Sequence, residues 1–335
     1  MKRLGVIILN WNGLELLKQF IPAASHYTIS DLSDLIVADN GSTDGSVTWL
    51  EENHPEVKII QLDRNYGFAE GYNRAIAMVD YPYVTLLNSD VEVTDGWWVP
   101  LLDFLESHKD AGAVQPKILS WHDRSSFEYA GAAGGYIDNL GYPYCRGRLF
   151  DKIEKDEGQY DGKPAEITWA SGACLMLPRE LYLKAGGLDA DFFAHMEEID
   201  LCIRIRFMGY RVCCVTDSKV YHVGGASLNS NNPKKTYLNF RNNLLLLHKN
   251  MPRREGRKML FKRRAADSLA FAMYCLKFDF ANARAVLRAH RDFRKMRKKY
   301  TEMPSENLYP TLPGSNRSAL ATRYIKMQSK LDPIQ

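Results

Sequence analysis

The 335 residues are 45% hydrophobic and 25% charged, which is typical of a soluble globular protein with one large or two modest domains. The net charge of +4 combines two oppositely charged segments. Residues 1–247 contain 23 Lys and Arg against 33 Asp and Glu, whereas residues 248–300 contain 17 against 4. This split predicts an acidic body with a basic appendage. No apolar run approaches the roughly 18 residues that a membrane-spanning helix needs, so we expect no such helix.

The first half of the chain alternates strand-like and helix-like stretches. Short runs rich in β-forming residues predict strands at 4–9, 35–38, 58–62 and 83–87. Helical patterns lie between them at 13–24, 44–52 and 69–78. Strands that alternate with helices predict βαβ units, and therefore an α/β protein with a mostly parallel central sheet flanked by helices.

The second half is less regular. Residues 111–177 are rich in Gly, Tyr and β-forming residues, and they predict irregular strands and loops. A helix is predicted at 197–208, strands at 211–215 and 219–221, and helical structure from residue 234 onward. Beyond residue 300, Pro304, Pro310, Pro313 and Gly314 predict a loosely ordered tail.

The cysteines and the N-terminus bear on the compartment. The six cysteines form no CxxC pair and no zinc-site spacing, and several lie in apolar surroundings. We therefore expect buried, reduced thiols and a cytoplasmic protein. The letters MKR followed by an apolar run resemble the start of a signal peptide, but the run is too short and NWN interrupts it.

Clusters rich in polar residues follow three of the predicted strands. The first runs from Asn10 through Trp11 to Asn12, the second begins at Asp39, and the third runs from Asn88 to Asp90. Ligands of open α/β sheets bind beyond the carboxyl ends of the strands. We therefore expect these clusters to line a common binding site.

The second cluster, DNGSTDG, has two interpretations. Asp39, held at a strand end, can accept a hydrogen bond from the N–H of a pyrimidine base, and Trp11 can offer a face on which the base stacks. The alternative is a plain strand-to-helix loop, in which Ser42 or Thr43 caps the following helix.

The stretch NYGFAEGYN stands at a predicted helix start. It contains Asn65, Gly67 and Asn73, and its glycines allow the backbone to approach a ligand closely. A tight turn with a packed aromatic side chain explains the same letters, so the stretch alone does not decide between the two.

The third cluster lies in LLNSDVEV. Asp90 and Glu92 are alternate residues, which would face the same side of an extended segment. Mg²⁺ and Mn²⁺ prefer oxygen ligands and commonly keep substrate phosphates as partners, so this acidic strand end is a candidate metal site. A capped turn is the alternative, because Asp and Asn also favour turns.

Two further stretches supply candidate acid–base groups. In FFAHMEEIDL, Glu197, Glu198 and Asp200 stand at a helix start, where acids also interact favourably with the helix dipole. One of them pointing inward would be a general base. In VYHVGG, His222 follows a strand-like run, although a lone His is more often an ordinary polar residue than a ligand.

These stretches in their order resemble the family 2 glycosyltransferases, and more narrowly the bacterial rhamnosyltransferase-like group. The resemblance rests on ILNWNG, VADNGSTDGS, NYGFAEGYNRA, LLNSDVEV, ASGACLMLPRELYLKAGGLDADFFAHMEEIDLCIRIRFMGYRV and VYHVGGAS, and covers about residues 3–230. It implies a GT-A fold, an inverting mechanism and a UDP- or dTDP-sugar donor. The acceptor would be a glycan or a lipid-linked sugar in the synthesis of bacterial surface polysaccharide, and the sugar rhamnose, galactose, N-acetylhexosamine or similar.

The resemblance also implies roles for individual residues. Asp90 would be the metal-binding acid of a DxD-like motif, and His222 a second ligand of Mg²⁺ or Mn²⁺. Glu198 would be the catalytic base, with Glu197 as the alternative. Residues expected to contact the nucleotide are Asn10, Trp11, Asn12, Asp39, Asn65, Gly67, Asn73 and Asn88. The chain departs from the family pattern at Asn88, which stands for the first Asp of DxD, and at Glu198, where Asp is common.

The basic segment completes the predicted organisation. We divide the chain into a GT-A catalytic domain at 1–235, basic amphipathic helices at 236–300 and the tail at 301–335. Basic helices with apolar residues suit the inner face of the plasma membrane. Packing against the catalytic domain or a homodimer interface explains the same pattern. Nucleic-acid binding fits the charge, but no motif supports it.

Three other functions fit part of the pattern. A sugar nucleotidyltransferase should have a Gly-rich phosphate loop with basic residues near its N-terminus, where this chain has ILNWNG. A dehydrogenase should have GxGxxG after its first strand, and the sequence has none there. A protein of the same fold that binds a sugar nucleotide without transferring it is the third alternative.

Overall fold

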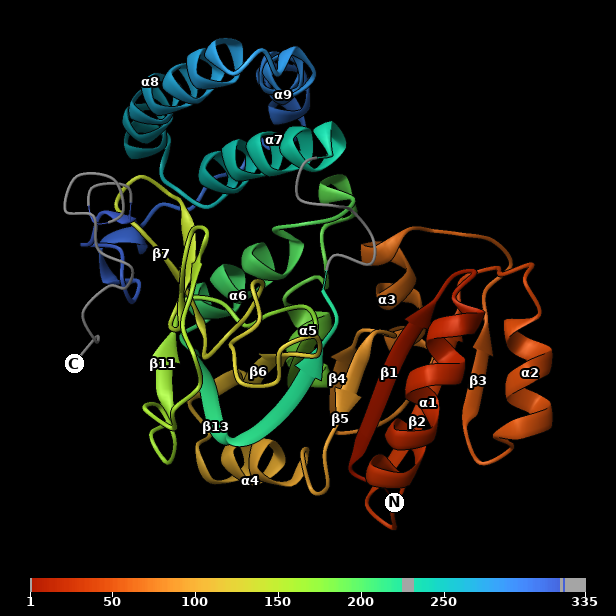
Figure 1. The fold of residues 1–335 in the computed structure, drawn as a ribbon. Coiled ribbons are helices and arrows are strands. Elements are labelled where there is room, and N and C mark those ends of the chain that lie inside the picture. The colour runs from red at the N-terminus through yellow and green to blue at the C-terminus, as the bar shows by residue number, and fades with distance from the viewer. Residues whose placement is uncertain (1, 225–231, 320–321, 323–335) are drawn as a thin grey trace.

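The computed structural model describes residues 2–224, 232–319 and 322 (Figure 1). Within these residues, the main sheet has nine strands in the order β11-β13-β6-β12-β4-β1-β2-β3, and β5 pairs with β13 beside this path. Its strands are β1 (Leu4–Asn10), β2 (Ser33–Asp39), β3 (Lys58–Gln61), β4 (Tyr83–Leu87), β5 (Val91–Val93), β6 (Ala111–Ser120), β11 (Ala165–Ile167), β12 (Cys174–Pro178) and β13 (Arg211–His222).

Helices cover both faces of this sheet, as an α/β fold requires. In the part of the chain before residue 210 these are α1 (Leu14–Thr28), α2 (Ser46–Asn53), α3 (Phe68–Ala77), α4 (Val99–Ser107), α5 (Arg179–Lys184) and α6 (Glu197–Phe207). Strand β1 illustrates the packing, because Val6 and Ile8 join the core under α1 and α4, whereas Ile7 joins the core under α3 and α6. Alternate residues of a strand point to opposite faces, so an uninterrupted apolar run fills both cores.

The predicted α/β class with a mostly parallel sheet is confirmed. Strands β1, β2, β3 and β4 lie at or within a few residues of the predicted positions, and they pair in parallel. Helix α1 continues past its predicted end and includes Pro22. The thiols are free, with five buried and Cys275 half-buried, as the apolar surroundings indicated.

The second half is more regular than its composition indicated. Strand β6 has ten residues, and residues 135–153 form a second, four-stranded antiparallel sheet. That sheet consists of β7 (Gly135–Ile137), β8 (Pro143–Cys145), β9 (Arg148–Leu149) and β10 (Lys152–Ile153). The two predicted strands after α6 are one strand, β13, whose register against β6 shifts between Val215 and Lys219. The bulge supplies the break that the sequence pattern suggested.

The C-terminal helices form a layer of their own, drawn at the top of Figure 1. They are α7 (Pro233–Lys249), α8 (Arg253–Leu276) and α9 (Phe280–Met296). Helix α7 packs on the core beside α6 and buries four consecutive leucines, Leu244 to Leu247. Among the described residues, no helix is both long enough and apolar enough to cross a bilayer.

The tail differs from its prediction in the part that the structure describes. Tyr309 and Leu312 are buried, and the Tyr309 hydroxyl donates to the carbonyl of Asp138. The Thr168 hydroxyl donates 2.7 Å to the carbonyl of Pro313. Residues 309–313 are therefore packed rather than loosely ordered, because aromatic and aliphatic side chains among the prolines fill a gap beside β7. Residues 320–321 and 323–335 lie outside the described residues.

Candidate active site

The sheet topology brings the candidate residues to one edge. Strands β1, β2 and β4 are parallel, β6 and β13 are parallel, and β12 is antiparallel to both β4 and β6. The carboxyl ends of β1, β2, β4, β6 and β13 therefore share an edge with the amino end of β12. Asn10, Asp39, Asn88 and His222 all stand at this edge, and Asp90 follows closely.

The ends of β1 and β2 are joined through Asp39. Its carboxylate accepts hydrogen bonds from the Asn10 side-chain amide at 3.1 Å and from the backbone N–H of Ser42 at 2.9 Å. The Asn12 side-chain oxygen accepts from the Thr43 N–H at 2.7 Å. The side-chain oxygen of Asn10 is buried without a hydrogen-bond partner. A buried polar atom of this kind at a strand end is a candidate ligand contact.

Hydrogen bonds to the side chain of Asn40 hold the stretch NYGF at the end of β2. The Asn40 amide nitrogen donates 3.1 Å to the Asn65 side-chain oxygen and 3.0 Å to the Gly67 carbonyl, and its oxygen accepts from the Tyr66 N–H at 2.9 Å. Gly67 has φ of 79° and starts α3. Trp11 is 56% exposed beside this edge, so its ring is open to a ligand.

Asn73 has a different role from the predicted one. Its side-chain oxygen accepts from the Tyr182 hydroxyl at 2.6 Å and from the Leu188 N–H at 2.9 Å. Its amide nitrogen donates 2.8 Å to the Leu188 carbonyl. These three bonds tie α3 to the loop after α5, so we correct Asn73 from a nucleotide contact to a structural residue.

Asp90 and His222 form the acidic part of the site. Asp90 Oδ1 lies 3.1 Å from His222 Nε2, and both side chains are buried. The other ring nitrogen, Nδ1, lies 3.6 Å from a carboxylate oxygen of Glu128, beyond hydrogen-bonding distance. Burial lowers the pKa of His222, but the two carboxylates outweigh it and raise the pKa to about 10. In this arrangement the two carboxylates favour the protonated form of the buried His222 imidazole.

Glu92 does not join Asp90. Its carboxylate accepts from Arg124 Nη2 at 2.7 Å and from the Trp121 indole at 2.9 Å. Asp90 precedes β5 rather than lying in it, so the alternation expected of an extended segment does not apply to this pair. Glu128 takes the second place near His222, and the sequence analysis missed it because it lies in the loop after β6.

Glu198 and Glu197 begin α6. The backbone before them has positive φ at three residues that are not glycine, Phe193 (66°), His195 (69°) and Met196 (77°). Such conformations are uncommon and cluster at functional sites. Glu197 is buried, whereas Glu198 is half-buried, and each has one buried carboxylate oxygen without a hydrogen-bond partner.

Burial shifts the titration of both acids. It raises the pKa of Glu198 to about 7, and burial together with the charge of Glu198 raises the pKa of Glu197 well above its usual 4.5. A base with a pKa near neutrality is suited to proton transfer at physiological pH. Glu198 is the more accessible of the two, which ranks it above Glu197 as the group that meets a substrate.

Glu198 also lies beside the strand edge. A Cβ placed on Gly172 would lie 3.7 Å from the Glu198 Cβ and 3.8 Å from the Phe68 ring. The next residue, Ala173, accepts a backbone hydrogen bond from Asn88 at 3.0 Å. The start of α6, the start of α3 and the end of β4 therefore meet around residues 172–173. Asp90, His222 and Glu198 belong to this one region of the fold.

The matches with known proteins agree with this geometry. Residues 5–154 match the model of the family described as "Glycosyl transferase family 2". This match, over somewhat less than half of the chain, and the relatives described below support a family 2, rhamnosyltransferase-like protein. The matched range contains Asn10, Asp39 and Asp90, whereas Glu198 and His222 lie beyond it.

Two curated relatives are rhamnosyltransferases. The chain is 28% identical over 224 residues to the N-acetylglucosaminyl-diphospho-decaprenol L-rhamnosyltransferase of Mycobacterium tuberculosis, covering 62% of this chain and 71% of the relative. It is 29% identical over 209 residues to the dTDP-rhamnosyl transferase RfbF of Shigella flexneri, covering 58% and 64%.

The fold resembles that of solved glycosyltransferases. GalNAc-T7, in a crystal structure with UDP, GalNAc and Mn²⁺, superposes with a TM-score of 0.58 at 14% sequence identity, covering 76% of this chain and 49% of that chain. At this identity the likeness concerns the fold alone. The predicted GT-A fold is thereby confirmed.

The residues of the site fit a divalent ion in one specific way. Within the described part of the chain, no group of three or more His, Cys, Asp and Glu side chains is arranged to hold a metal by itself. Neighbouring ligand atoms on a Mg²⁺ ion lie about 3 Å apart, and the Asp90 and His222 atoms are 3.1 Å apart. This spacing suits an ion that takes its other ligands from a donor diphosphate and water.

Proposed function

We propose that this family 2 glycosyltransferase transfers a sugar from a dTDP- or UDP-sugar to a glycan or lipid-linked acceptor, with inversion at the anomeric carbon. Rhamnose is the first candidate sugar, because two relatives are named as rhamnosyltransferases. The observation that supports the proposal is that Asp39, Asp90 and His222 stand at or just beyond one edge of the sheet, with Glu198 close to Gly172 at that edge. The place of such a reaction is the synthesis of bacterial surface polysaccharide.

The nucleotide would lie across the ends of β1 and β2. Asp39 is held by Asn10 and Ser42, so its carboxylate is oriented before the donor arrives. It would accept the N–H of uracil or thymine, which both bases have. Trp11 would stack on the base, and Asn12, Asn65, Gly67 and Asn88 would line the ribose and diphosphate. Preorganised contacts of this kind lower the entropic cost of binding.

Asp90 and His222 would hold Mg²⁺ or Mn²⁺ against the diphosphate. When bound, the ion neutralises the negative charge that grows on the departing nucleotide diphosphate. His222 must then bind through a neutral nitrogen, so ion binding displaces its Nε2 proton. Asn88 supplies no charge, which leaves Asp90 as the carboxylate ligand.

Glu198 would be the general base. Its carboxylate accepts the proton of the acceptor hydroxyl while that oxygen forms a bond to the anomeric carbon. The bond from this carbon to the diphosphate oxygen breaks on the opposite face, and the electron pair leaves with the nucleoside diphosphate. A single displacement inverts the configuration. Glu197 stays more buried and would be protonated, which lets both acids occupy the same helix start.

The test is a transfer assay with a panel of donors that includes dTDP-rhamnose, UDP-galactose and UDP-N-acetylglucosamine, with and without Mn²⁺. The acceptor is N-acetylglucosamine linked through diphosphate to a short polyprenol. We expect transfer from one donor, with the inverted anomer identified by NMR. Binding of a donor without release of nucleoside diphosphate would favour the alternative of a sugar-nucleotide-binding protein. Formation of a sugar nucleotide from a sugar phosphate would favour a nucleotidyltransferase.

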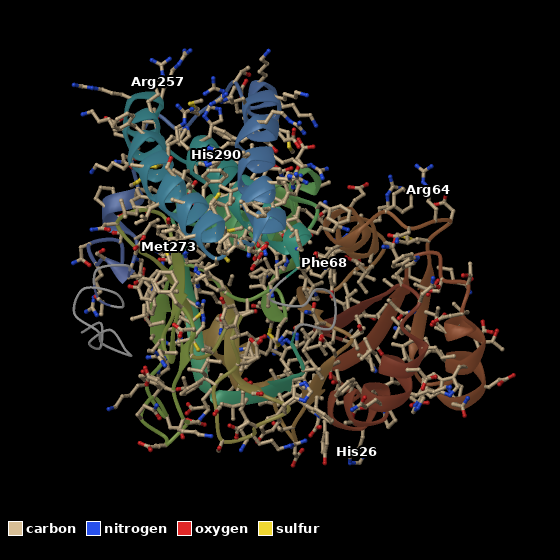
Figure 2. All side chains as sticks on the ribbon, turned by 45° about the horizontal axis from the view of Figure 1, so that its top comes forward. His26, Arg64, Phe68, Arg257, Met273 and His290 are labelled. Atoms are coloured by element: carbon tan, nitrogen blue, oxygen red, sulfur yellow. The ribbon has the colours of Figure 1, made fainter. Side chains whose placement is uncertain are left out.

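A second surface suits a lipid-linked acceptor. Helix α8 has a solvent-facing stripe of apolar and basic side chains, Arg254, Lys258, Phe261, Lys262, Leu269, Met273 and Leu276, all of them exposed. Phe278 and Phe280 continue it at the turn into α9. Leu276 and Phe278 are each 80% exposed. In Figure 2, Arg257 and Met273 mark the basic and the apolar parts of α8.

We propose that this stripe rests on the anionic inner face of the plasma membrane, which would place the enzyme in the cytoplasm at that surface. Each basic side chain near such a surface contributes about 1 kcal/mol, and buried apolar side chains add to this. Its test is flotation with liposomes of anionic or neutral lipid, comparing the wild type with Leu276→Glu/Phe278→Glu.

The matched control is Met78→Glu, at an exposed apolar position at the end of α3. We expect the double variant to lose flotation with anionic liposomes and the control to keep it. Equal flotation of all three proteins would contradict the proposal. If the double variant instead converts a dimer into a monomer by light scattering, the stripe is a homodimer interface.

A further inference from the structure

The segment before Glu198 is strained and is held from outside. Phe193, His195 and Met196 all have positive φ, although each has a side chain larger than glycine. Residues in such conformations persist only where their surroundings impose them. The segment leads directly into the first turn of α6, so its shape decides where Glu197 and Glu198 point.

Asn242 of α7 supplies the strongest of these constraints. Its side chain is fully buried, and its amide nitrogen lies 2.9 Å from the Phe192 carbonyl, 2.8 Å from that of Ala194 and 2.7 Å from that of His195. The two hydrogens of this amide are thus shared among three carbonyl groups of the strained segment, so at least one of the three bonds is bifurcated. These contacts span about 50 positions of the chain and join the first C-terminal helix to the candidate base.

Arg241 fixes the orientation of that amide. Its Nε donates 2.8 Å to the Asn242 side-chain oxygen, and its Nη2 donates 2.7 Å to the Phe192 carbonyl. Because the oxygen is held by a guanidinium donor, the NH₂ group must face the three carbonyls. The arrangement therefore does not depend on an arbitrary choice between the two ends of the amide.

Helix α7 and the residue after it also form hydrogen bonds to the first turn of α6. Asp200, in the first turn of α6, accepts from Lys249 Nζ at 2.8 Å and from the Asn250 amide at 2.8 Å. Glu198 therefore lies between two sets of bonds to α7, one before it and one after it. A helix that serves only as a membrane support would not need polar contacts on both sides of a candidate base.

We propose that Asn242, oriented by Arg241, is a positioning residue that holds Glu198 in its reactive place; this rests on the proposed role of Glu198. Asn242 is fully buried, so it would touch neither donor nor acceptor. It acts on the backbone from which Glu198 extends, and the carboxylate direction follows from that backbone. A displacement of about 1 Å in a reacting group can lower the rate by roughly 100-fold. The catalytic machinery thus includes a helix that lies beyond residue 232.

Asn243 provides a matched control on the same helix. It is also buried, and its amide donates to the Gly141 carbonyl in the turn between β7 and β8, away from α6. Asn242→Ala and Asn243→Ala both remove a buried amide from α7, so both are expected to lower the melting temperature. Only the first removes contacts to the segment before Glu198.

The test measures transfer kinetics and donor affinity for Asn242→Ala, Asn243→Ala and Arg241→Lys. We expect Asn242→Ala to lower kcat by about 10- to 100-fold while the dissociation constant of the nucleoside diphosphate stays within about twofold. Arg241→Lys keeps the charge but loses the oriented Nε donor, so a smaller decrease in kcat is expected. Asn243→Ala should keep its kcat. Equal kcat values for the Asn242 and Asn243 variants would overturn the proposal.

A double variant separates positioning from general loss of structure. If Asn242 acts through Glu198, Asn242→Ala should lower kcat far less in a Glu198→Gln background than in the wild type. Losses that multiply in full would overturn the proposal. If Asn242→Ala does not fold, the same comparison with Arg241→Lys decides it. If Glu198→Gln itself keeps full transfer, the proposed base is wrong, and that failure is distinct from a failure of Asn242.

Discussion

Asp90 Oδ1 lies 3.1 Å from His222 Nε2, although the two residues stand 132 positions apart in the chain. Strands β5 and β13 pair antiparallel with His222 opposite Val91, and the Val223 N–H donates to the Asp90 carbonyl. Backbone pairing therefore holds the two side chains in contact at the edge where β4 ends. The same edge holds Asp39 on one side and Glu198 near residues 172–173.

Replacing the proposed base should abolish transfer but not binding. Glu198→Gln keeps the size of the side chain and removes its ability to accept a proton. General-base assistance is typically worth about 10²–10⁴-fold, so we expect kcat to decrease by that factor. Donor affinity, measured by calorimetry, should stay the same. Glu197→Gln is the matched control, and a larger loss in that variant would exchange the roles of the two acids.

The pH dependence of the reaction should follow the ionisation of the Glu198 carboxyl group. The base works only when deprotonated, and its pKa is raised to about 7. Below this pH the carboxylate is protonated, so kcat/KM should decrease about tenfold for each pH unit. Above it kcat/KM should level off. An acidic limb near pH 4.5, the ordinary value of a Glu, would show that burial does not act on the base in this way.

The carboxylate of Glu198 should lower the free energy of unfolding at neutral pH and above. A carboxyl whose pKa is raised in the folded protein binds its proton more tightly there than in the unfolded chain. Its unfavourable contribution therefore appears as the pH rises from 4.5 to about 7 and is complete above that. Glu198→Gln removes this contribution. At pH 8 we expect the variant to gain about 1–3 kcal/mol in free energy of unfolding, measured with urea.

Binding of the divalent ion should depend on Asp90 and, less strongly, on Glu128. Treatment with EDTA should remove activity, and Mn²⁺ should restore it. Asp90→Asn should not be restored by Mn²⁺, because the charged ligand is lost. Glu128→Gln changes a carboxylate that faces the other nitrogen of His222, and such a change typically lowers metal affinity by about 10–100-fold. Full activity of the wild-type enzyme in EDTA would contradict the proposal that transfer requires a divalent ion.

Base recognition should depend on Asp39. A lost hydrogen bond to a charged group costs about 1.5–3 kcal/mol, so Asp39→Ala should raise the donor KM by at least about tenfold. The matched control is Asp44→Ala, which removes a carboxylate from the neighbouring loop, where it accepts from Leu14 and Ser46. Both variants should be less stable, but only Asp39→Ala should weaken donor binding. Equal KM values would place the base elsewhere.

Part of the site follows from the sequence alone. Alternating strands and helices set a parallel sheet, and the carboxyl ends of parallel strands necessarily lie at one edge. The positions of Asn10, Asp39 and Asn88 at that edge follow from local pattern and from this geometric rule. The acids of α6 and the imidazole of His222 were found by their resemblance to family motifs. Their nearness to the strand ends was an expectation that only coordinates could examine.

Other parts were decided by contacts between distant segments. Asn73 lies in a stretch that suits a nucleotide loop, yet it bonds to Tyr182 and Leu188, more than 100 positions away in the chain. Glu128 and Asn242 stand in stretches with no motif, and each meets the site through a partner far along the chain. Periodicity does not reveal such contacts, because it reports which face a residue occupies and not what packs there.

The sequence by itself determined the fold class, the edge of the sheet proposed to bind the donor and the acidic residues near that edge. Tertiary structure decided which of those acids meet, which amides hold them and how far burial shifts their pKa. The physical reason is that secondary structure depends on neighbours along the chain, whereas desolvation and hydrogen bonding depend on whatever the fold brings into contact. The helices beyond residue 232 show the difference. Their sequence indicates a basic surface, whereas their structure adds hydrogen bonds to α6 and to the segment before it, which carry the proposed base Glu198.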